Sequence, residues 1–401
     1  MALIVQKYGG TSVGSVERIR LVAERVARAR ADGHSLVVVV SAMSGETNRL
    51  LALGRELAER PDPREMDALV ATGEQVSAAL VAIALAERGV PARSLLGHQV
   101  RLMTDDAFTK ARIKAIDDSR LLSVLDAGRV AVVAGFQGID EEGNITTLGR
   151  GGSDTTAVAI AAALGAEVCE IYTDVDGVYT ADPRICPSAR KIERISYEEM
   201  LELASLGAKV LQLRSVEVAM KYGVAVHVRT SFSEETGTMV TKEDASLESI
   251  VVTGVTADRN TAKVTIRGVV DQPGIAAAIF EALADRHVSV DMIIQNVSED
   301  GRTDLTFTVA QDDADTACAI AAEALVDKRE VLVDPDVVKV SIVGLGMRSH
   351  AGVAARMFRL LAAASVNIQA ISTSEIKVSC LIEARHADLA VRTLHDGFLG
   401  G

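Results

Sequence analysis

The chain has 401 residues, of which 48% are hydrophobic and 24% charged, and its net charge is −13. A chain of this length is expected to form two or three domains with sizeable cores. The acidic balance argues against a nucleic-acid partner, because phosphate contacts need a basic surface. Aromatic residues make up only 3% and tryptophan is absent, which also disfavours base-stacking platforms.

The apolar runs and the cysteines indicate the compartment. The N-terminal run Met1–Val5 is too short for a signal-peptide core, and runs such as Leu36–Val40 are too short to cross a bilayer. The seven histidines are dispersed, and the four cysteines form no Cys-x-x-Cys pair: Cys169, Cys186, Cys318 and Cys380. We therefore expect a cytoplasmic protein with no membrane partner, no disulfide framework and no metal site of its own.

Strand and helix patterns alternate from the first residues onward. A short apolar strand at Leu3–Val5 precedes Lys7 and two glycines, and an amphipathic helix follows from about residue 16 to residue 30. The β-branched run Leu36–Val40 is typical of a strand buried on both faces of a parallel sheet. It ends in the small polar loop Ser41–Thr47, and ligands of open α/β sheets bind at that edge.

The same alternation continues to about residue 228. Further helices are predicted near residues 48–59, 63–88, 197–206 and 209–222, and further strands near 130–136, 166–172 and 224–228. Strands and helices that alternate over about 250 residues predict a doubly wound α/β domain. We place its end near the polar segment 231–246.

The stretch TLGRGGSDTTAVAIAAALG, residues 147–165, places a glycine-rich turn before an apolar helix. A helix N-terminus fed by glycines suits an anion. Arg150 adds a bidentate clamp for carboxylate or phosphate, and Asp154 adds a carboxylate. Taken alone, this motif is equally consistent with a tight loop that caps a buried helix. It does not match the dinucleotide fingerprint, whose third glycine would fall at Asp154.

Beyond Ile250 the chain repeats itself. Gly274, Phe280 and Val288 of one unit align without a gap with Gly352, Phe358 and Val366 of the next. Each unit has a β-α-β-β-α-β pattern over about 70 residues, which is small for a catalytic domain. Paired small sheets of this kind more often bind a regulator or a partner.

Six motifs occur in order along the chain: KYGGTS (7–12), VVSAMSGET (39–47), TGEQ (72–75), TLGRGGSDTTA (147–157), YTDVDGVYTADPR (172–184) and GAKVL (207–211). Together they resemble aspartate kinase, a family that phosphorylates the side-chain carboxylate of L-aspartate, and the two repeats resemble ACT domains, which bind amino-acid effectors. The resemblance covers essentially the whole chain. It implies a three-layer amino-acid-kinase α/β domain with a mostly parallel sheet at 1–245, followed by two ferredoxin-like α+β ACT domains, one at 264–335 and one formed by 250–263 and 340–401.

The resemblance implies a role for each matching residue. Lys7 is expected to meet the γ-phosphate of ATP, Glu74 to hold the α-ammonium group of aspartate, and Arg150 to clamp the α-carboxylate. The catalytic set is then Lys7, Asp154 and Lys209. We expect Asp154 to orient the reacting groups, because the attacking carboxylate is already ionised at pH 7 and needs no general base. Further substrate contacts are expected from Ser41, Thr47, Gly151, Gly152 and Ser153.

The implied nucleotide is ATP with Mg²⁺, which coordinates mainly phosphate oxygens and water, so that no protein cage is needed. The residues expected to line this site are Lys7, Tyr8, Gly9, Gly10, Thr173, Asp174, Tyr179, Asp182, Arg184 and Lys209. One departure follows Lys209: this chain has Gln212-Leu213, where many members of the family carry His-Pro.

The resemblance also implies regulation by lysine, threonine or both. In the first repeat, Asp271-Gln272-Pro273-Gly274 precedes a helix whose N-terminus can take an α-carboxylate. The second repeat has Arg348-Ser349-His350-Ala351-Gly352 instead, so its own pocket is either different or absent. The effector-binding residues are expected to be Asp271, Gly274, Ile275, Ala276, Asp291, Gln295, Asn367, Ile368, Ser374 and Glu375. ACT-like sheets usually pair, which implies a homodimer or a higher oligomer; a shorter regulatory chain is an open alternative.

Two other functions remain open from the sequence. A non-catalytic amino-acid sensor could keep the fold, although the retention of Lys7, Arg150, Asp154 and Lys209 favours an enzyme. A related carboxylate kinase could act on another acidic substrate, such as glutamate.

Overall fold

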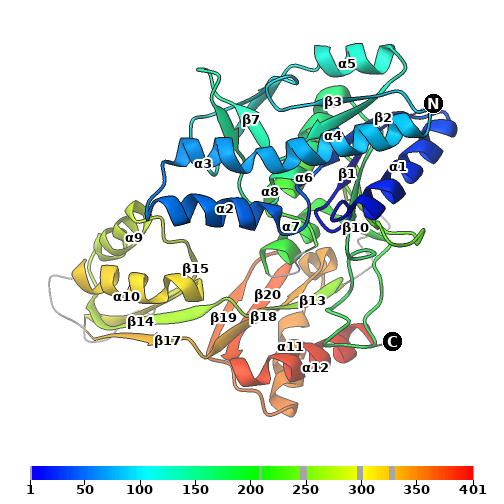
Figure 1. Cartoon of the computed structure of the whole chain (residues 1–401). Helices are drawn as coiled ribbons and strands as arrows, with labels where there is room; N and C mark the ends of the chain where they lie inside the picture. Colours follow the sequence, from blue (N-terminus) through cyan, green and yellow to red (C-terminus); the bar gives the residue numbers. More distant parts are fainter. Residues whose placement is uncertain (1, 207–209, 244–250, 296–300, 325–329, 401) are drawn as a thin grey trace. The chain divides into compact units, whose positions relative to one another are not determined.

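The computed structural model describes residues 2–206, 210–243, 251–295, 301–324 and 330–400. These form two compact units (Figure 1). The first unit takes the described residues of 2–178, 191–204 and 210–243, and the second takes 179–190, 205–206 and 251–400.

The first unit is built on an eight-stranded sheet in the order β10-β12-β11-β9-β1-β2-β6-β3. Its neighbouring strands pair in parallel except for β11 with β12. The strands are β1 (Leu3–Tyr8), β2 (Ser35–Val40), β3 (Ala92–Leu95), β6 (Val130–Ala134), β9 (Val168–Thr173), β10 (Arg194–Ser196), β11 (Val226–Thr230) and β12 (Thr238–Thr241). The predicted mostly parallel sheet is therefore confirmed.

Helices cover both faces of this sheet. Val38 of β2 packs with Val22 and Val81, which come from helices on one face, whereas the neighbouring Val39 faces Ser153 on the other, across Gly135. Successive side chains of a strand point to opposite faces, so a β-branched run buried throughout requires a helical layer on each side. The helices of this unit are α1 (Val16–Ala31), α2 (Glu46–Leu57), α3 (Pro63–Val70), α4 (Thr72–Glu87), α5 (Ser119–Asp126), α6 (Gly152–Leu164), α7 (Tyr197–Ser205) and α8 (Leu213–Tyr222).

One helical stretch, Pro63–Glu87, is long and apolar enough to cross a membrane by length and composition alone. It comprises α3 and α4, and it buries two carboxylates inside the first unit. Asp67 accepts hydrogen bonds from the backbone of Thr109 and Thr147, and Glu74 accepts one from Ala42. These contacts pack one side of the stretch against the rest of the first unit.

A second, small sheet in the first unit was not predicted from the sequence. Its order is β5-β4-β7-β8, and its strands are β4 (Leu102–Thr104), β5 (Ile113–Ile116), β7 (Gln137–Ile139) and β8 (Ile145–Thr147). The strand predicted at 130–136 ends at Ala134, because Phe136 has a φ of 68°, which turns the chain out of the large sheet.

The second unit contains two four-stranded sheets with helices packed on them, as expected for two ACT domains. Their orders are β15-β16-β14-β17 and β13-β18-β20-β19, and their strands pair antiparallel. The strands are β13 (Gly254–Asp258), β14 (Ala262–Val270), β15 (Val290–Gln295), β16 (Arg302–Val309), β17 (Val331–Asp334), β18 (Val337–Val343), β19 (Ala370–Thr373) and β20 (Lys377–Glu383). The helices are α9 (Ile275–Asp285), α10 (Ala314–Glu323), α11 (Val353–Ala363) and α12 (Ala387–Leu399), with short 3₁₀ turns η1 (Gln311–Asp313), η2 (Leu345–Ser349) and η3 (Ala384–His386).

Residues 179–190 belong to the second unit, although the sequence places them within a first domain that ends at 245. The backbone N–H of Val255 in β13 donates to the carbonyl of Thr180 at 2.8 Å. Ala181 and Cys186 lie in the same apolar core as Val340 of β18 and Leu394 of α12. The segment therefore packs with the second ACT sheet because its apolar side chains are buried there.

Candidate active site

The carboxyl ends of three neighbouring parallel strands carry the motif residues of the first unit. Lys7 and Tyr8 end β1, Ser41 follows β2, and Thr173 ends β9. Both β2 and β9 pair with β1 in parallel, with Tyr8 opposite Val40 on one side and Tyr172 on the other. The three strand ends therefore meet at one edge of the sheet, where ligands bind in open α/β folds.

Lys7 and Asp154 form a buried ion pair at this edge. Lys7 Nζ lies 2.6 Å from Asp154 Oδ1, and each side chain is only 10% exposed. Asp154 is in the first turn of α6, which begins at Gly152 after Gly151 in a left-handed conformation with a φ of 69°. The pair holds a positive charge beside a helix N-terminus, and both features stabilise an anionic phosphate.

Two glycines let the backbone after β1 approach its neighbours closely: Gly9 lies against Lys7, and Gly10 lies against the loop after β2. A Cβ at Gly9 would lie 3.3 Å from Lys7 Nζ, and one at Gly10 would lie 3.0 Å from the carbonyl oxygen of Ala42. The loop is tied to strand β9, because Gly9 N–H donates to the carbonyl of Tyr172 at 3.1 Å. A side chain at Gly9 would crowd the space beside Lys7 that a phosphate needs, and one at Gly10 would press on the loop after β2.

Glu74 is a buried carboxylate with one oxygen left unpaired. It lies in the first turn of α4 and is 3% exposed. Its Oε1 accepts a hydrogen bond from Ala42 N at 2.9 Å, while Oε2 has no hydrogen-bond partner among the described residues. Burial raises the pKa of Glu74 to about 7, against the opposing effect of the Ala42 hydrogen bond. A buried carboxylate of this kind is expected to receive a cation from a ligand.

The neighbouring glycine makes this arrangement possible. A Cβ at Gly73 would lie 2.8 Å from Ala42 Cβ, so only glycine lets α4 approach the loop after β2 closely enough for the Glu74–Ala42 bond. Ser41 of the same loop and Thr47 in the first turn of α2 are both partly buried. Ser41 N–H donates to the carbonyl of Tyr8 at 3.0 Å, which ties this loop to the lysine loop.

The turn before α6 carries the other predicted substrate residues. Arg150 is exposed, whereas Ser153 is 7% exposed. A Cβ at Gly151 would lie 1.9 Å from Gln212 Cγ, so the turn packs directly on Gln212, the residue at which the chain departs from the pattern of the family it resembles. That departure therefore lies against the residue that follows Arg150, the expected carboxylate clamp.

Only part of the predicted nucleotide set lies in the first unit. Thr173 Oγ1 donates to Asp174 Oδ1 at 3.1 Å at the end of β9. Three residues of the predicted nucleotide set belong to the second unit: Tyr179, Asp182 and Arg184. Arg184 Nη2 lies 2.7 Å from Asp182 Oδ2, and this bond lowers the pKa of Asp182. Lys209 lies outside the described residues. The nucleotide roles of these residues remain predictions.

Several residues that support the site were missed from the sequence. Asp67 is 1% exposed and accepts hydrogen bonds from Thr147 N at 2.7 Å, Thr147 Oγ1 at 2.6 Å and Thr109 N at 2.9 Å. Arg214 donates to the carbonyls of Leu148 and Ala111 at 2.7 and 3.0 Å. Both residues fix the chain just before the glycine turn. Their hydrogen-bond partners are distant in sequence, so no local pattern predicts these contacts. The one signal in the sequence is Asp67, an acidic residue within an apolar helix.

In the first ACT repeat, Gly274 has a φ of 96° and caps α9, which places Ile275 and Ala276 in its first turn. Asp271 and Gln295 are exposed. Asp291 forms an ion pair with Lys339 of β18 in the second repeat, so its carboxylate joins the two repeats and is already engaged. The effector role predicted for Asp291 therefore requires that this ion pair open or share its charge.

The predicted effector residues of the second repeat lie on exposed turns. Asn367 is exposed and Ile368 partly buried after α11, and Ser374 and Glu375 are exposed between β19 and β20. Glu375 Oε2 lies 3.3 Å from Arg348 Nε.

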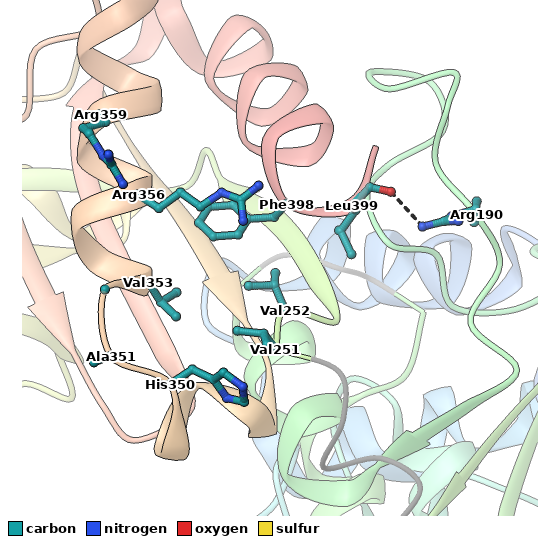
Figure 2. A pocket seen from close by; sticks show the side chains of 11 residues that line it. Arg190, Val251, Val252, His350, Ala351, Val353, Arg356, Arg359, Phe398 and Leu399 are labelled. Atoms are coloured by element: carbon teal, nitrogen blue, oxygen red, sulfur yellow. Dashed lines mark hydrogen bonds between the residues drawn. The ribbon is translucent and has the colours of Figure 1, made fainter. Parts of the chain in front are cut away.

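The second repeat also has a cavity of about 590 Å³ at the start of α11 (Figure 2). Three arginines and a histidine line it together with apolar side chains. Arg356 stacks over Phe398 at 5.0 Å from the ring centroid, and Arg190 Nη2 donates to the carbonyl of Leu399 at 2.7 Å. Its cationic lining contrasts with Asp271 at the equivalent loop of the first repeat, so the two repeats differ in charge at this loop.

Comparison with known proteins agrees with the fold. Residues 2–230 match the amino acid kinase family, and residues 264–325 and 340–398 match the ACT domain. An aspartokinase of Pseudomonas aeruginosa is 58% identical over 402 residues, which cover 99% of this chain and 98% of the relative. The chain belongs to the aspartokinase family.

More distant aspartokinases extend the same agreement. One from Corynebacterium glutamicum is 51% identical over 409 residues, covering 100% of this chain and 97% of the relative. The crystal structure of E. coli aspartokinase III in complex with aspartate and ADP has a TM-score of 0.82 at 28% identity, with both chains covered completely. The chain is thus an aspartate kinase, an enzyme with a kinase domain and tandem ACT domains, as its motifs predict.

Proposed function

We propose that the first unit transfers the γ-phosphoryl group of ATP to the side-chain carboxylate of L-aspartate, forming 4-phospho-L-aspartate and ADP. This reaction is the first step of the biosynthetic pathway that leads to lysine, threonine and methionine. The observation that carries the proposal is that Oε2 of buried Glu74 has no hydrogen-bond partner among the described residues, on the sheet edge that also holds the Lys7–Asp154 ion pair. Glu74 then offers a partner for the ammonium group of aspartate, and Lys7 offers a partner for the phosphate of ATP.

Each charged residue has a separate task in this mechanism. Glu74 binds the α-ammonium group and Arg150 the α-carboxylate, which leaves the side-chain carboxylate as the free nucleophile. One of its oxygens attacks the γ-phosphorus, the bond from phosphorus to the bridging oxygen breaks, and ADP leaves. Lys7 stabilises the charge on the transferring oxygens. Asp154 holds the Lys7 ammonium group in place, and no proton has to be removed because the nucleophile is ionised at pH 7.

Mg²⁺ bound to ATP fits this arrangement as a group brought by the substrate. Asp154, the carboxylate at the start of α6, is already paired with Lys7 at 2.6 Å, so the metal would be held mainly by phosphate oxygens and water. When bound, it supplies neutralisation of phosphate charge. Lys209 is proposed to add a second positive charge at the phosphates.

The acceptor site can be tested with a substrate that lacks the ammonium group. Succinate has the two carboxylates of aspartate without its amine, so wild-type enzyme should use it far less well, and Glu74→Gln should reduce this preference by at least tenfold in kcat/KM. Glu87→Gln, an exposed position at the end of the same helix, is the matched control. A preference for aspartate that persists unchanged in Glu74→Gln would remove Glu74 from the ammonium site.

We further propose that lysine, threonine or both inhibit the enzyme through the ACT repeats, and that these repeats also make the enzyme a homodimer or a higher oligomer. E. coli aspartokinase III, at 28% identity and a TM-score of 0.80, has been crystallised in complex with lysine and aspartate in a T-state, which supports lysine as one effector. Inhibition requires only that the effector bind one state better than the other, and a tenfold effect corresponds to about 1.4 kcal/mol.

Asp271 is the residue to test for regulation. It is exposed beside the capping residue Gly274, so Asp271→Ala should not affect folding. The variant should relieve inhibition while it leaves the uninhibited kcat within a few-fold of the wild type, whereas Asp285→Ala, at the other end of α9, should remain inhibited. Wild-type enzyme that ignores both amino acids at millimolar concentration would show that the repeats serve assembly only.

A further inference from the structure

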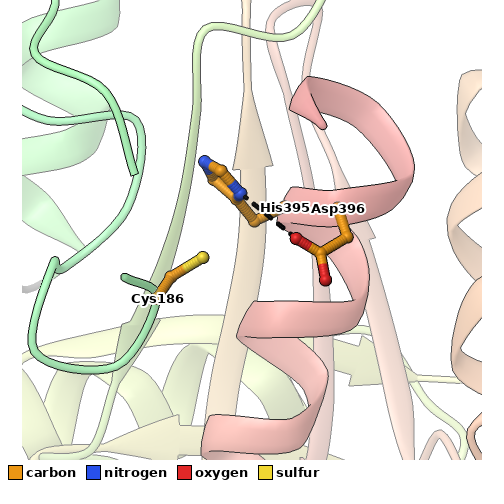
Figure 3. Close-up of side chains that lie close together, drawn as sticks. All are labelled: Cys186, His395 and Asp396. Atoms are coloured by element: carbon orange, nitrogen blue, oxygen red, sulfur yellow. Dashed lines mark ion pairs between the residues drawn. The ribbon is translucent and has the colours of Figure 1, made fainter. Parts of the chain in front are cut away.

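Three different metal-binding side chains meet in the second unit, and one of them is far from the other two in sequence. The thiol of Cys186, the imidazole of His395 and the carboxylate of Asp396 each offer a ligand atom, and these atoms lie within 4.8 Å of one another (Figure 3). Cys186 comes from the segment 179–190, and the other two come from the last turns of α12. Sequence spacing cannot predict this cluster, because it has no short Cys or His repeat.

The buried members are held in a state that suits a metal. Cys186 is 1% exposed and His395 is 0% exposed. His395 Nε2 lies 2.9 Å from Thr180 Oγ1, and Nδ1 faces Asp396 Oδ1 at 3.8 Å. Because Nε2 is hydrogen-bonded to Thr180, Nδ1 is the ring nitrogen available to a metal, and metal-bound histidines are commonly held in this way by their other nitrogen.

The interior of the cluster is polar but poorly bonded. Ser188 Oγ lies 3.3 Å from Cys186 Sγ, 3.5 Å from His395 Nδ1 and 3.4 Å from Asp396 Oδ1. The distances to nitrogen and oxygen exceed those of a good hydrogen bond made by a hydroxyl, and the contact with sulfur is a weak hydrogen bond. Three donor atoms thus converge around one point without a strong bond at that point.

The spacing between His395 and Asp396 is close to that of a tetrahedral zinc site, and the three ligand atoms together lie within 4.8 Å of one another. Zinc bonds of about 2.0–2.3 Å to nitrogen, oxygen and sulfur place neighbouring ligand atoms about 3.3–3.7 Å apart. The 3.8 Å between His395 Nδ1 and Asp396 Oδ1 therefore needs to shorten by only a few tenths of an ångström. Asp396 can make this adjustment, because its side chain is 69% exposed.

We propose that Cys186, His395 and Asp396 bind one zinc ion, with Ser188 Oγ or water as the fourth ligand. A thiolate with an imidazole favours zinc over magnesium or calcium, which prefer oxygen ligands. Binding replaces the thiol proton by the metal, so one proton is released from Cys186 to solvent as the zinc–sulfur bond forms. The ion fastens the segment 179–190 to α12 and stabilises the second unit; it takes no part in phosphoryl transfer.

Cobalt binding tests the thiolate directly. The full-length protein is stripped with a chelator and titrated with Co²⁺, whose bond to a thiolate gives a charge-transfer band in the near ultraviolet. We expect one band-forming Co²⁺ per chain, displaced by Zn²⁺, and a rise in melting temperature with Zn²⁺. Cys186→Ser should abolish the band and the rise, whereas Cys318→Ser, a partly buried cysteine of the same unit, should keep both.

A second variant guards against a folding artefact. Asp396→Asn changes an exposed side chain and should weaken Zn²⁺ affinity at least tenfold while kinase activity, which resides in the first unit, stays unchanged. A wild-type protein without the band, or a band that survives in Cys186→Ser, would overturn the proposal and leave the cluster as a hydrogen-bonded contact between α12 and the segment 179–190.

Discussion

Replacing Glu74 by glutamine is expected to stabilise the unliganded protein at pH 8 and to weaken the binding of aspartate at the same time. The carboxylate is buried, and only one of its oxygens has a hydrogen-bond partner among the described residues. Its ionised form is therefore unfavourable until a ligand brings a positive charge. Glutamine keeps the acceptor oxygen for Ala42 N–H and removes the charge.

The size and sign of this effect follow from the pKa. The pKa of Glu74 is about 7 in the folded protein, against an ordinary value of 4.5. Between these values the folded state binds more protons than the unfolded state, so stability falls as the pH rises from 4.5 to 7 and stays low above it. A difference of about 2.5 in pKa, at 1.36 kcal/mol each, corresponds to about 3 kcal/mol as an upper figure.

Urea unfolding of wild type and Glu74→Gln at pH 5, 6, 7 and 8 measures this directly. The stability advantage of the variant should grow by up to about 3 kcal/mol between pH 5 and pH 8, and saturating aspartate should reduce it, because the α-ammonium group then stabilises the wild-type carboxylate. Glu87→Gln should show no such pH dependence. A variant that is equally destabilised at every pH would mean that Glu74 is already paired in the unliganded protein, and the ammonium-site reasoning would be refuted.

Two further substitutions test the geometry of the site. Lys7→Ala should lower kcat by at least 100-fold, since one fixed donor to a transferring group is typically worth about 3 kcal/mol; near-normal turnover with an unchanged circular dichroism spectrum would contradict the assignment. Gly151→Ala should raise the KM for aspartate more than that for ATP, because its φ of 69° and the 1.9 Å approach of Gln212 Cγ leave no room for a Cβ. Gln212→Ala in the same chain should restore part of the loss, and the absence of any restoration would show that backbone strain alone is responsible.

The sequence predicted those parts of the fold that local patterns determine. The run Leu36–Val40 is buried on both faces because only a central parallel strand accepts uninterrupted β-branched residues. The glycine turn before α6 was located because Gly151 and Gly152 precede an apolar run of helical length. Glu74 was found through its motif, but its unpaired oxygen could not be predicted, since burial depends on how α4 packs against the loop after β2.

The remaining features depend on contacts between distant residues. Asp67 accepts two hydrogen bonds from Thr147, and this contact arises from the packing of the fold, because Asp67 belongs to no recognised motif. The sequence places residues 179–190 in the first domain because they continue a kinase motif. The backbone hydrogen bond from Val255 to Thr180 and a shared apolar core place them in the second unit. Cys186 and His395 lie close together because the segment 179–190 packs in the same apolar core as α12. Residues so far apart in sequence cannot be paired by a spacing rule.

The most direct test of the central claim is the identity of the phosphorylated product. Enzyme with ATP and Mg²⁺ is incubated with aspartate, with glutamate or with no acceptor, in the presence of hydroxylamine, which converts an acyl phosphate to a stable hydroxamate. Identification of the product by mass spectrometry distinguishes the side-chain carboxylate from the α-carboxylate. We predict the β-hydroxamate of aspartate in an amount equal to the ADP formed, with little product from glutamate and none without acceptor. ADP formed at the same rate in all three reactions, without hydroxamate, would contradict the proposed function.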